Sequence, residues 1–328
     1  MPEKKGSIFT VSRPEFIPAN LGSLFLGLSW AVSLPIDYLR LGILVVLCFL
    51  TIYLISAYGA QLNTLSDYKL DLKDKRKEHL VRAVDRVGRR KIKAFIVAEF
   101  LLSLIPLYLL YQFEGTLTLA ILWAVGVFLA YAYSMPPIRL KKRSWLQMIA
   151  IILVLSIIPM LFVFYTFAPQ VNLLFIIFLS GQALTVYSVI IPTEIRDYFG
   201  DSAMKVRTMT VRLGLVKASA LSMVLLCIGG VLCGAAFFWV LFNGSYPILN
   251  VFLLAIVLAD AYVLRQYKKL YSLSKKFASN EKSSLANEIT DLAASNPKWI
   301  TIVTQSLVLM SLVLLVYKIF LGGILPSL

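Results

Sequence analysis

The sequence predicts an all-α membrane protein whose single domain, residues 1–328, is a bundle of nine transmembrane helices. Apolar residues make up 59% of the chain and charged residues 15%, and the mean hydropathy is +0.81, which is far outside the range of soluble domains. Apolar runs of roughly 20 residues, the length that a helix needs to cross a bilayer, recur along the chain. The runs are continuous, whereas the strands of a membrane β-barrel alternate in polarity, so we expect helices.

The apolar runs place the nine expected spans. These lie at about 17–35, 41–63, 93–111, 115–133, 145–167, 171–193, 215–242, 246–267 and 299–321. The charged segment Met1–Phe16 precedes the first run, and no cleavage site of small residues follows it, so we interpret this run as a retained helix and not as a signal peptide. The expected loops on one side of the membrane are 64–92, 134–144, 194–214 and 268–298.

The formal charge of +15 is distributed according to this topology. Of the 32 Lys and Arg residues, all but Arg40 and Lys318 fall in the N-terminal segment or in, or within a few residues of, these four loops. The positive-inside rule therefore predicts a cytoplasmic N-terminus, cytoplasmic loops and a multi-pass protein of the cell membrane. Because membrane topology accounts for the basic residues, we expect membrane lipid and no nucleic acid as a partner.

The segment NTLSDYKLD, residues 63–71, ends the second run with oxygen-bearing side chains at every fourth position: Asn63, Asp67 and Asp71. A helix turns about 100° per residue, so the three side chains share one face. Carboxylates four residues apart repel each other on a helix, and we expect a cation to compensate them. The alternative interpretation is a solvated helix end interleaved with lysines.

A second acidic cluster, in TEIRDYFGDSAMKVRT (193–208), ends the sixth run with Asp197 and Asp201 four residues apart and Glu194 one turn earlier. The charge rule places both clusters on one side of the membrane, where they can face each other. Carboxylate and amide oxygens without His or Cys suit Mg²⁺, which completes its coordination with waters and substrate phosphate oxygens. The two clusters therefore predict a diphosphate site.

Cations that bind phosphate accompany the two clusters. They are Arg76, Arg139, Lys141, Arg196 and Arg207. The chain has no Walker A motif, and the single histidine, His79, has no identifiable partner for a nucleophilic triad. P-loop nucleotide chemistry and triad hydrolysis are therefore excluded.

With these motifs, the chain resembles the UbiA superfamily of intramembrane prenyltransferases. That family is characterised by N-x-x-x-D-x-x-x-D after its second helix, D-x-x-x-D after its sixth, and nine helices. YSMPPIRLKKR (133–143) is similar to its Y-S-x-P-P-x-R-L-K segment, and RDYFGDSAMKVRTMTVRLG (196–214) to the continuation of its second motif. The resemblance spans the whole chain.

The resemblance implies that two Mg²⁺ ions, bridged by the diphosphate of a prenyl donor such as geranylgeranyl diphosphate, draw off the leaving group, after which a lipophilic acceptor captures the prenyl group. Asn63, Asp67 and Asp71 would hold one ion, and Asp197 and Asp201 the other. The residues expected at the diphosphate are Arg139, Lys141 and Arg196. Tyrosines near the motifs are candidates for shielding an allylic cation, although tyrosine is also common at membrane interfaces. They are Tyr68, Tyr133, Tyr187 and Tyr198.

Departures from the family pattern leave the acceptor open. The usual R-P-x-P-S-G continuation is absent, so Arg76 is a weak match, and Thr193 and Lys205 stand where Asn and Gly are common; Glu194 is a candidate metal ligand or base. By analogy, the acceptor is of the quinone-precursor, glycerol-lipid, pigment or carotenoid type. The alternatives are a terpene cyclase of the same fold and, less favoured because the ionisable residues cluster at one face, a membrane transporter.

Overall fold

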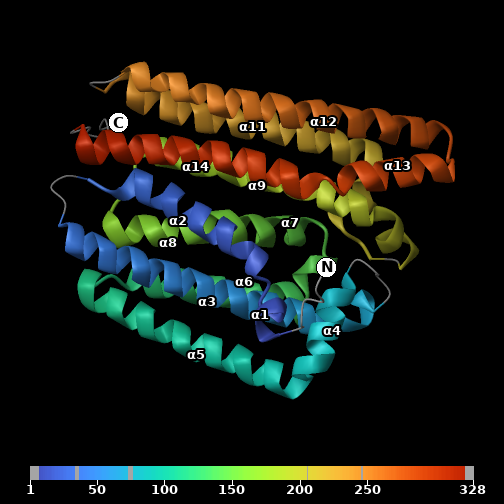
Figure 1. Ribbon diagram of the computed structural model, residues 1–328, viewed down its shortest axis with the longest axis horizontal. Helices are drawn as coiled ribbons and strands as arrows, with labels where there is room; N and C mark the ends of the chain where they lie inside the picture. The colour runs from blue at the N-terminus through green and yellow to red at the C-terminus, as the bar shows by residue number, and fades with distance from the viewer. Residues whose placement is uncertain (1–6, 34–36, 73–76, 205, 245–246, 322–328) are drawn as a thin grey trace.

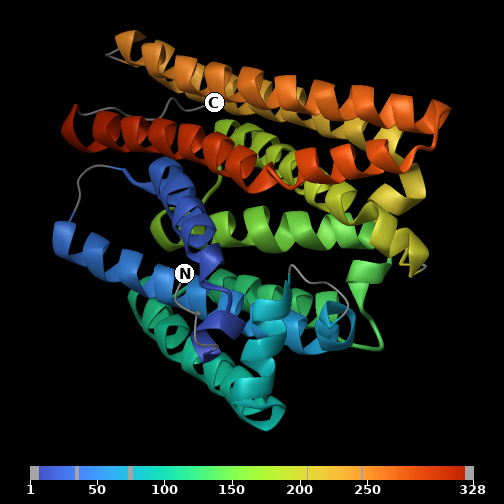
Figure 2. The same ribbon diagram turned by 45° about the vertical axis from the view of Figure 1, so that its right-hand side comes forward.

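The computed structural model describes residues 7–33, 37–72, 77–204, 206–244 and 247–321. Long helices lie side by side along the length of the molecule, and no strand occurs within these ranges (Figure 1). In both views α11 and α12 run together along one edge of the bundle, and α5 lies at the opposite edge (Figure 1 and Figure 2). The predicted all-α class is confirmed.

The helices follow the expected order. The long ones are α2 (Ile17–Ala31), α3 (Tyr38–Asp71), α5 (Arg89–Glu114), α6 (Leu117–Ser134), α9 (Leu173–Ala203), α11 (Leu215–Phe242), α12 (Leu253–Ser279) and α14 (Asn296–Phe320). Between α6 and α9, α7 (Trp145–Ile152) continues through a π-helical turn, Leu153–Ile157, into α8 (Ile158–Phe167). The short helices are α1 (Ile8–Val11), α4 (Glu78–Val87), α10 (Met209–Leu213) and α13 (Ser283–Ala293), with 3₁₀ turns at Pro14–Phe16, Leu140–Lys142 and Pro247–Phe252.

Eight helical stretches in the described ranges are long and apolar enough to cross a membrane, where nine were predicted. The first expected span corresponds to α2, whose 15 residues reach about 22 Å at 1.5 Å per residue, less than the hydrocarbon thickness. The end of α2 is buried, and Lys318 Nζ of α14 donates to the carbonyl oxygens of Ser29 and Trp30, each at 3.0 Å. The lysine thereby satisfies two of the acceptors that a helix end leaves free. The count of nine and the cytoplasmic N-terminus remain predictions.

Both helices that carry acidic clusters extend beyond their apolar runs. α3 continues to Asp71 and α9 to Ala203, because hydropathy marks the lipid-immersed part of a helix whereas the hydrogen-bond ladder continues through polar residues. The acidic clusters therefore occupy the last turns of helices, and parts of the expected loops 64–92 and 194–214 are helical. The expected loop 268–298 likewise contains the end of α12 and all of α13.

The largest part of the core lies where α2, α8, α9, α11, α12 and α14 meet. Trp30 of α2 stacks on Phe178 of α9 with 5.0 Å between ring centroids, and Phe237 of α11 packs against both rings. This aromatic cluster joins the short helix α2 to the helices that carry and support the second acidic cluster.

The helices α9 and α11 cross with their backbones in contact. A Cβ atom added to Gly181 of α9 would lie 2.8 Å from the carbonyl oxygen of Gly229 and 2.9 Å from the amide nitrogen of Cys233, both on α11. A Cβ atom on Gly229 would lie 2.7 Å from the Gly181 oxygen. Glycine at both positions allows the close approach that small residues give to membrane helices, and the crossing fixes α9 on α11.

Replacing Gly181 with alanine is expected to lower the free energy of unfolding by about 1–3 kcal/mol, because the added methyl group overlaps fixed backbone atoms. Thermal unfolding in detergent measures the change. The control is Gly234→Ala, also within α11, where an added Cβ meets no atom within 4 Å. Equal melting temperatures for the two variants would show that the crossing tolerates a methyl group and that this account of the packing is wrong.

Candidate active site

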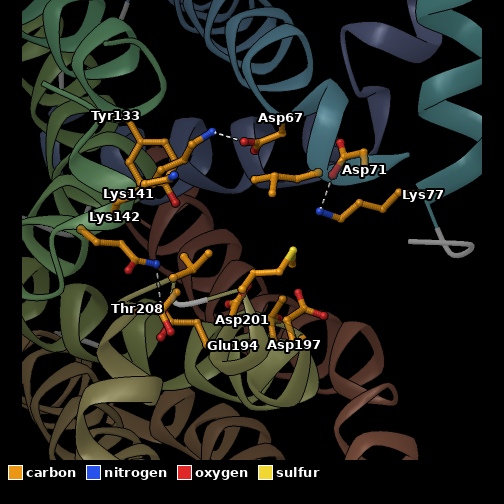
Figure 3. A pocket seen from close by; sticks show the side chains of 16 residues that line it. Asp67, Asp71, Lys77, Tyr133, Lys141, Lys142, Glu194, Asp197, Asp201 and Thr208 are labelled. Atoms are coloured by element: carbon orange, nitrogen blue, oxygen red, sulfur yellow. Dashed lines mark hydrogen bonds and ion pairs between the residues drawn. The ribbon is translucent and has the colours of Figure 1, made fainter. Parts of the chain in front are cut away.

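One end of the bundle, where α4 and α13 lie (Figure 1), contains a cavity of about 380 Å³, whose lining side chains are drawn in Figure 3. Its walls are formed by the last turns of α3 and α9, the 3₁₀ turn Leu140–Lys142, the start of α7 and the segment before α10. The lining residues are Asp67, Leu70, Asp71, Lys77, Tyr133, Lys141, Lys142, Gln147, Thr193, Glu194, Asp197, Gly200, Asp201, Met204, Val206 and Thr208. The structure thus brings the two acidic clusters of the sequence to opposite walls of one cavity.

The first wall is organised around Lys141. Its Nζ lies 2.5 Å from Asp67 Oδ1 and donates to Asn63 Oδ1 at 3.0 Å and to Ser66 Oγ at 2.7 Å, so all three N–H groups are used. Arg139, in a left-handed backbone conformation with φ 41°, turns the chain back towards α3 and places its Nη2 3.4 Å from the same Asp67 oxygen. Burial lowers the pKa of Lys141, and Asp67 partly offsets that effect.

Asp71, one turn further along α3, is paired with Lys77, which lies just before α4. Lys77 Nζ donates to Asp71 Oδ1 at 2.9 Å, and the aspartate is buried. Burial by itself lowers the pKa of Lys77, but the hydrogen bond to Asp71 and the charges of Asp71, Asp197 and Asp67 outweigh it and raise that pKa. Lys77 is therefore a cation held between carboxylates of both walls.

The second wall belongs to the last turns of α9. Asp197 accepts two hydrogen bonds of 3.0 Å from its neighbour Arg196, one from Nε and one from Nη2, and Asp201 lines the cavity one turn later. Figure 3 shows both aspartates opposite Asp67 and Asp71.

Glu194 is a buried acid of the cavity with hydrogen-bond partners on both carboxylate oxygens. Gln147 Nε2 of α7 donates to its Oε1 at 2.9 Å, and the backbone N–H and hydroxyl of Thr210 donate to its Oε2 at 3.2 and 2.8 Å. Both oxygens of Glu194 are therefore engaged within the protein, and these contacts join α9 to α7 and α10.

Only one of the four candidate tyrosines lines the cavity. Tyr133 forms part of the wall, whereas Tyr187 is buried outside the lining. Tyr68 donates its hydroxyl to Asp85 at 2.5 Å and carries the guanidinium of Arg89 over its ring at 4.3 Å. Tyr198 packs edge-on against a neighbouring phenylalanine.

Of the five cations predicted to bind phosphate, one lines the cavity. Lys141 lines the cavity, while Arg139 and Arg196 reach Asp67 and Asp197 from outside the lining. Arg207 is exposed and does not line the cavity, and Arg76 lies outside the described residues.

Sequence reasoning missed four polar lining residues, Lys77, Lys142, Gln147 and Thr208. The two lysines could not be separated from the many other cations of their loops. Gln147 gave a signal, because it is a lone amide among the apolar residues WLQMIAII, where a buried polar group is costly.

The donor set of the cavity fits Mg²⁺. It consists of carboxylate and amide oxygens without thiolate or imidazole, which favours hard cations. Among the residues that the structure describes, no three Asp, Glu, His or Cys side chains are gathered closely enough to hold an ion by themselves. This arrangement suits a metal whose coordination is completed by water and phosphate oxygens, with Asp67, Asp71, Asp197 and Asp201 as its nearest protein ligands.

Solved structures share the fold of this chain. A structure of digeranylgeranylglyceryl phosphate synthase matches with a TM-score of 0.61 and 16% identity, covering 93% of this chain and 97% of the other. Structures of a UbiA homologue from Archaeoglobus fulgidus, bound to DMAPP and Mg²⁺ or to GPP and Mg²⁺, match with a TM-score of 0.60 and 15% identity, each covering 90% of this chain and 99% of the other.

At these identities the structural matches show the fold. No curated protein sequence matches this chain. A family model described as the UbiA prenyltransferase family matches residues 20–283, most of the chain, which confirms the resemblance found in the sequence motifs. The protein therefore belongs to the UbiA prenyltransferase family.

Proposed function

We propose that this protein transfers a polyprenyl group from a prenyl diphosphate, such as geranylgeranyl diphosphate, to a lipophilic acceptor of the quinone-precursor, glycerol-lipid, pigment or carotenoid type. The observation that carries the proposal is the pair of acidic walls, Asp67 with Asp71 and Asp197 with Asp201, that face each other across one cavity. Two Mg²⁺ ions are proposed, one for each wall. When bound, the metal withdraws negative charge from the diphosphate and makes it a better leaving group.

The residues of the chain bind and orient the donor. Lys77, which neutralises Asp71, has N–H groups left to donate to diphosphate oxygens, and Lys141, whose N–H groups are taken by the first wall, contributes its charge. Both cations stabilise the negative charge that develops when the bond between carbon and oxygen breaks. The bonding electron pair leaves with the diphosphate. The ring of Tyr133 provides an aromatic wall for the allylic cation.

The cavity lies at the ends of long apolar helices, a position that suits a substrate with a charged head and a lipid-soluble tail. The charged head of the donor can lie among the polar side chains while its apolar tail extends along the bundle towards lipid. Combined with the distribution of Lys and Arg, this arrangement supports a multi-pass protein of the cell membrane with its active site facing the cytoplasm.

Metal removal tests the proposal. Purified protein in detergent is expected to release diphosphate from radiolabelled geranylgeranyl diphosphate with Mg²⁺, to stop when EDTA is added, and to recover when Mg²⁺ is restored. The lipid-phase products then separate transfer from cyclisation by mass. Release that continues in EDTA, or folded protein that releases no diphosphate from donors of any chain length, would contradict the proposal.

A further inference from the structure

The helix α9 lacks one backbone hydrogen bond directly before the second acidic cluster. Pro192 lies inside the helix and has no N–H, so it cannot donate to the carbonyl oxygen of Ser188, four residues earlier. The ring of an internal proline also crowds that carbonyl, which makes the position a point where a helix can bend. The direction of the last turns of α9, which carry Asp197 and Asp201, is therefore not fixed by the backbone hydrogen bonds alone.

Side chains of two other helices donate to the backbone of α9 at this proline. Tyr267 of α12 donates its hydroxyl to the Ser188 carbonyl oxygen at 3.2 Å and so replaces the N–H that Pro192 lacks. Asn296, the first residue of α14, donates through Nδ2 to the next carbonyl oxygen, that of Val189, at 2.6 Å. Three helices are thus joined at the point where the hydrogen-bond ladder of α9 is broken.

Asn296 also connects this point to the wall of the cavity. Its Nδ2 donates to Thr193 Oγ1 at 2.7 Å, and Thr193 lines the cavity one turn before Asp197. A backbone carbonyl only accepts hydrogen bonds, so the contact with Val189 fixes the orientation of the Asn296 amide. Both hydrogens of Nδ2 are therefore used, one on each side of Pro192.

The burial of Asn296 is costly. Its side chain is fully buried, and its Oδ1 accepts no hydrogen bond from any described residue. A leucine of similar size would fill the same space without an unpaired polar atom, so ordinary core packing does not account for an amide here. The family model ends at residue 283, and α14 with Asn296 lies outside the matched segment.

We propose that Asn296 and Tyr267 are positioning residues of the diphosphate site. By holding α9 at Pro192, they set the direction of its last turns and with it the distance between Asp197 and the opposite wall. The helices α12 and α14 then determine how tightly the second wall binds metal, although no described residue of either helix lines the cavity. The inference rests on the proposed function, because it concerns the metal site of the same cavity.

Binding of Mn²⁺, which prefers the same oxygen ligands as Mg²⁺, tests the inference through the EPR signal of the free ion. Protein in lipid nanodiscs is titrated with Mn²⁺ in the presence of a non-hydrolysable thiolo analogue of geranylgeranyl diphosphate. Asn296→Leu removes two hydrogen bonds and is expected to weaken Mn²⁺ binding about tenfold. Tyr267→Phe removes one hydroxyl, keeps the ring, and is expected to weaken it about threefold. Affinities within about twofold of the unaltered protein in both variants overturn the inference.

Lys318→Met is the matched control. Lys318 is also a buried polar residue of α14 that donates to two backbone carbonyl oxygens, but those belong to Ser29 and Trp30 of α2, and it does not line the cavity. Its replacement is expected to lower the melting temperature and to leave Mn²⁺ binding unchanged. A loss of Mn²⁺ binding equal to that of Asn296→Leu would show that general loosening of α14 explains both results, and it would overturn the inference.

Asp197→Asn separates an effect on the second wall from a general effect on the cavity. In this variant the remaining Mn²⁺ is bound by the first wall, so the addition of Asn296→Leu is expected to change its affinity little. A further loss as large as the one that Asn296→Leu causes alone overturns the inference. If Asn296→Leu does not fold, the same comparison with Tyr267→Phe decides the matter.

Mn²⁺ binding by the unaltered protein separates this inference from the proposed function. If the unaltered protein binds no Mn²⁺ with the donor analogue, the proposed function fails. If it binds Mn²⁺ and neither Asn296→Leu nor Tyr267→Phe weakens the binding, only the inference about these two residues fails.

Discussion

Asp67→Asn and Asp197→Asn are each expected to lower the rate of Mg²⁺-dependent diphosphate release by about a thousandfold, the loss seen when one electrostatic contact to a transition state is removed. The two aspartates face each other from opposite walls of the cavity. The amide keeps the shape of the side chain but removes the charge that attracts a metal, so the loss reflects metal binding and not repacking. Initial rates over a series of Mg²⁺ concentrations measure the effect, and the apparent affinity for Mg²⁺ should fall together with the rate.

Asp85→Asn is the control for both variants. Asp85 lies on α4 at the same end of the bundle, accepts the hydroxyl of Tyr68 and does not line the cavity. Its replacement should leave the rate nearly unchanged. If Asp67→Asn or Asp197→Asn retained a rate similar to that of Asp85→Asn, the two-walled metal site would be wrong.

Lys141→Met is expected to lower the same rate by about a hundredfold, because it removes the cation that holds the first wall together at the point where the diphosphate binds. The Lys141 ammonium contacts Asn63, Ser66 and Asp67 at once, so methionine leaves the more distant Arg139 as the remaining partner of Asp67 among the described residues. Arginine is a poor substitute, since its planar fork does not match three acceptors around a single nitrogen. The measurement is diphosphate release at saturating donor, compared with the affinity for the donor.

Lys142→Met is the control that separates the specific contacts of Lys141 from the total positive charge of the cavity. Lys142 is the next residue and also lines the cavity, but no hydrogen bond or ion pair with the acidic clusters is found for it among the described residues. A loss of less than about tenfold is expected, because only the general field of the cavity changes. Equal losses for the two variants would mean that total positive charge matters and that the contacts of Lys141 do not.

The fold class and the acidic clusters could be predicted because both are local properties of the sequence. Continuous apolar runs report burial in lipid, and acidic residues four positions apart share one helical face wherever the helix lies. The partners of the acids could not be predicted, because Lys77 and Lys141 reach Asp71 and Asp67 through turns whose geometry is not encoded in spacing. Tyr68 illustrates the same limit: it lies next to Asp67 in sequence but is turned towards Asp85 and Arg89 on the outside of the site.

The length of α2 could not be predicted from hydropathy either. The apolar run at 17–35 continues past the last helical residue, Ala31, into an extended Val32, and a composition window does not register where the hydrogen-bond ladder stops. The buried lysine that contacts the end of α2, Lys318, lies almost 300 positions away in sequence. Its contacts with Ser29 and Trp30 therefore appear only in the folded chain.

The opposite walls of the cavity also link ligand binding to the mechanical integrity of the bundle. One wall belongs to α3, which packs on α5, and the other to α9, whose backbone touches α11 through Gly181 and Gly229. A diphosphate that is bound by both walls therefore connects the pair α3 and α5 to the pair α9 and α11. By linkage, a donor at 100 times its dissociation constant adds about 2.7 kcal/mol to the stability of the folded chain. The substrate head group would then stabilise the packing of the two helix pairs while it is bound. The protein would be least rigid between product release and binding of the next donor.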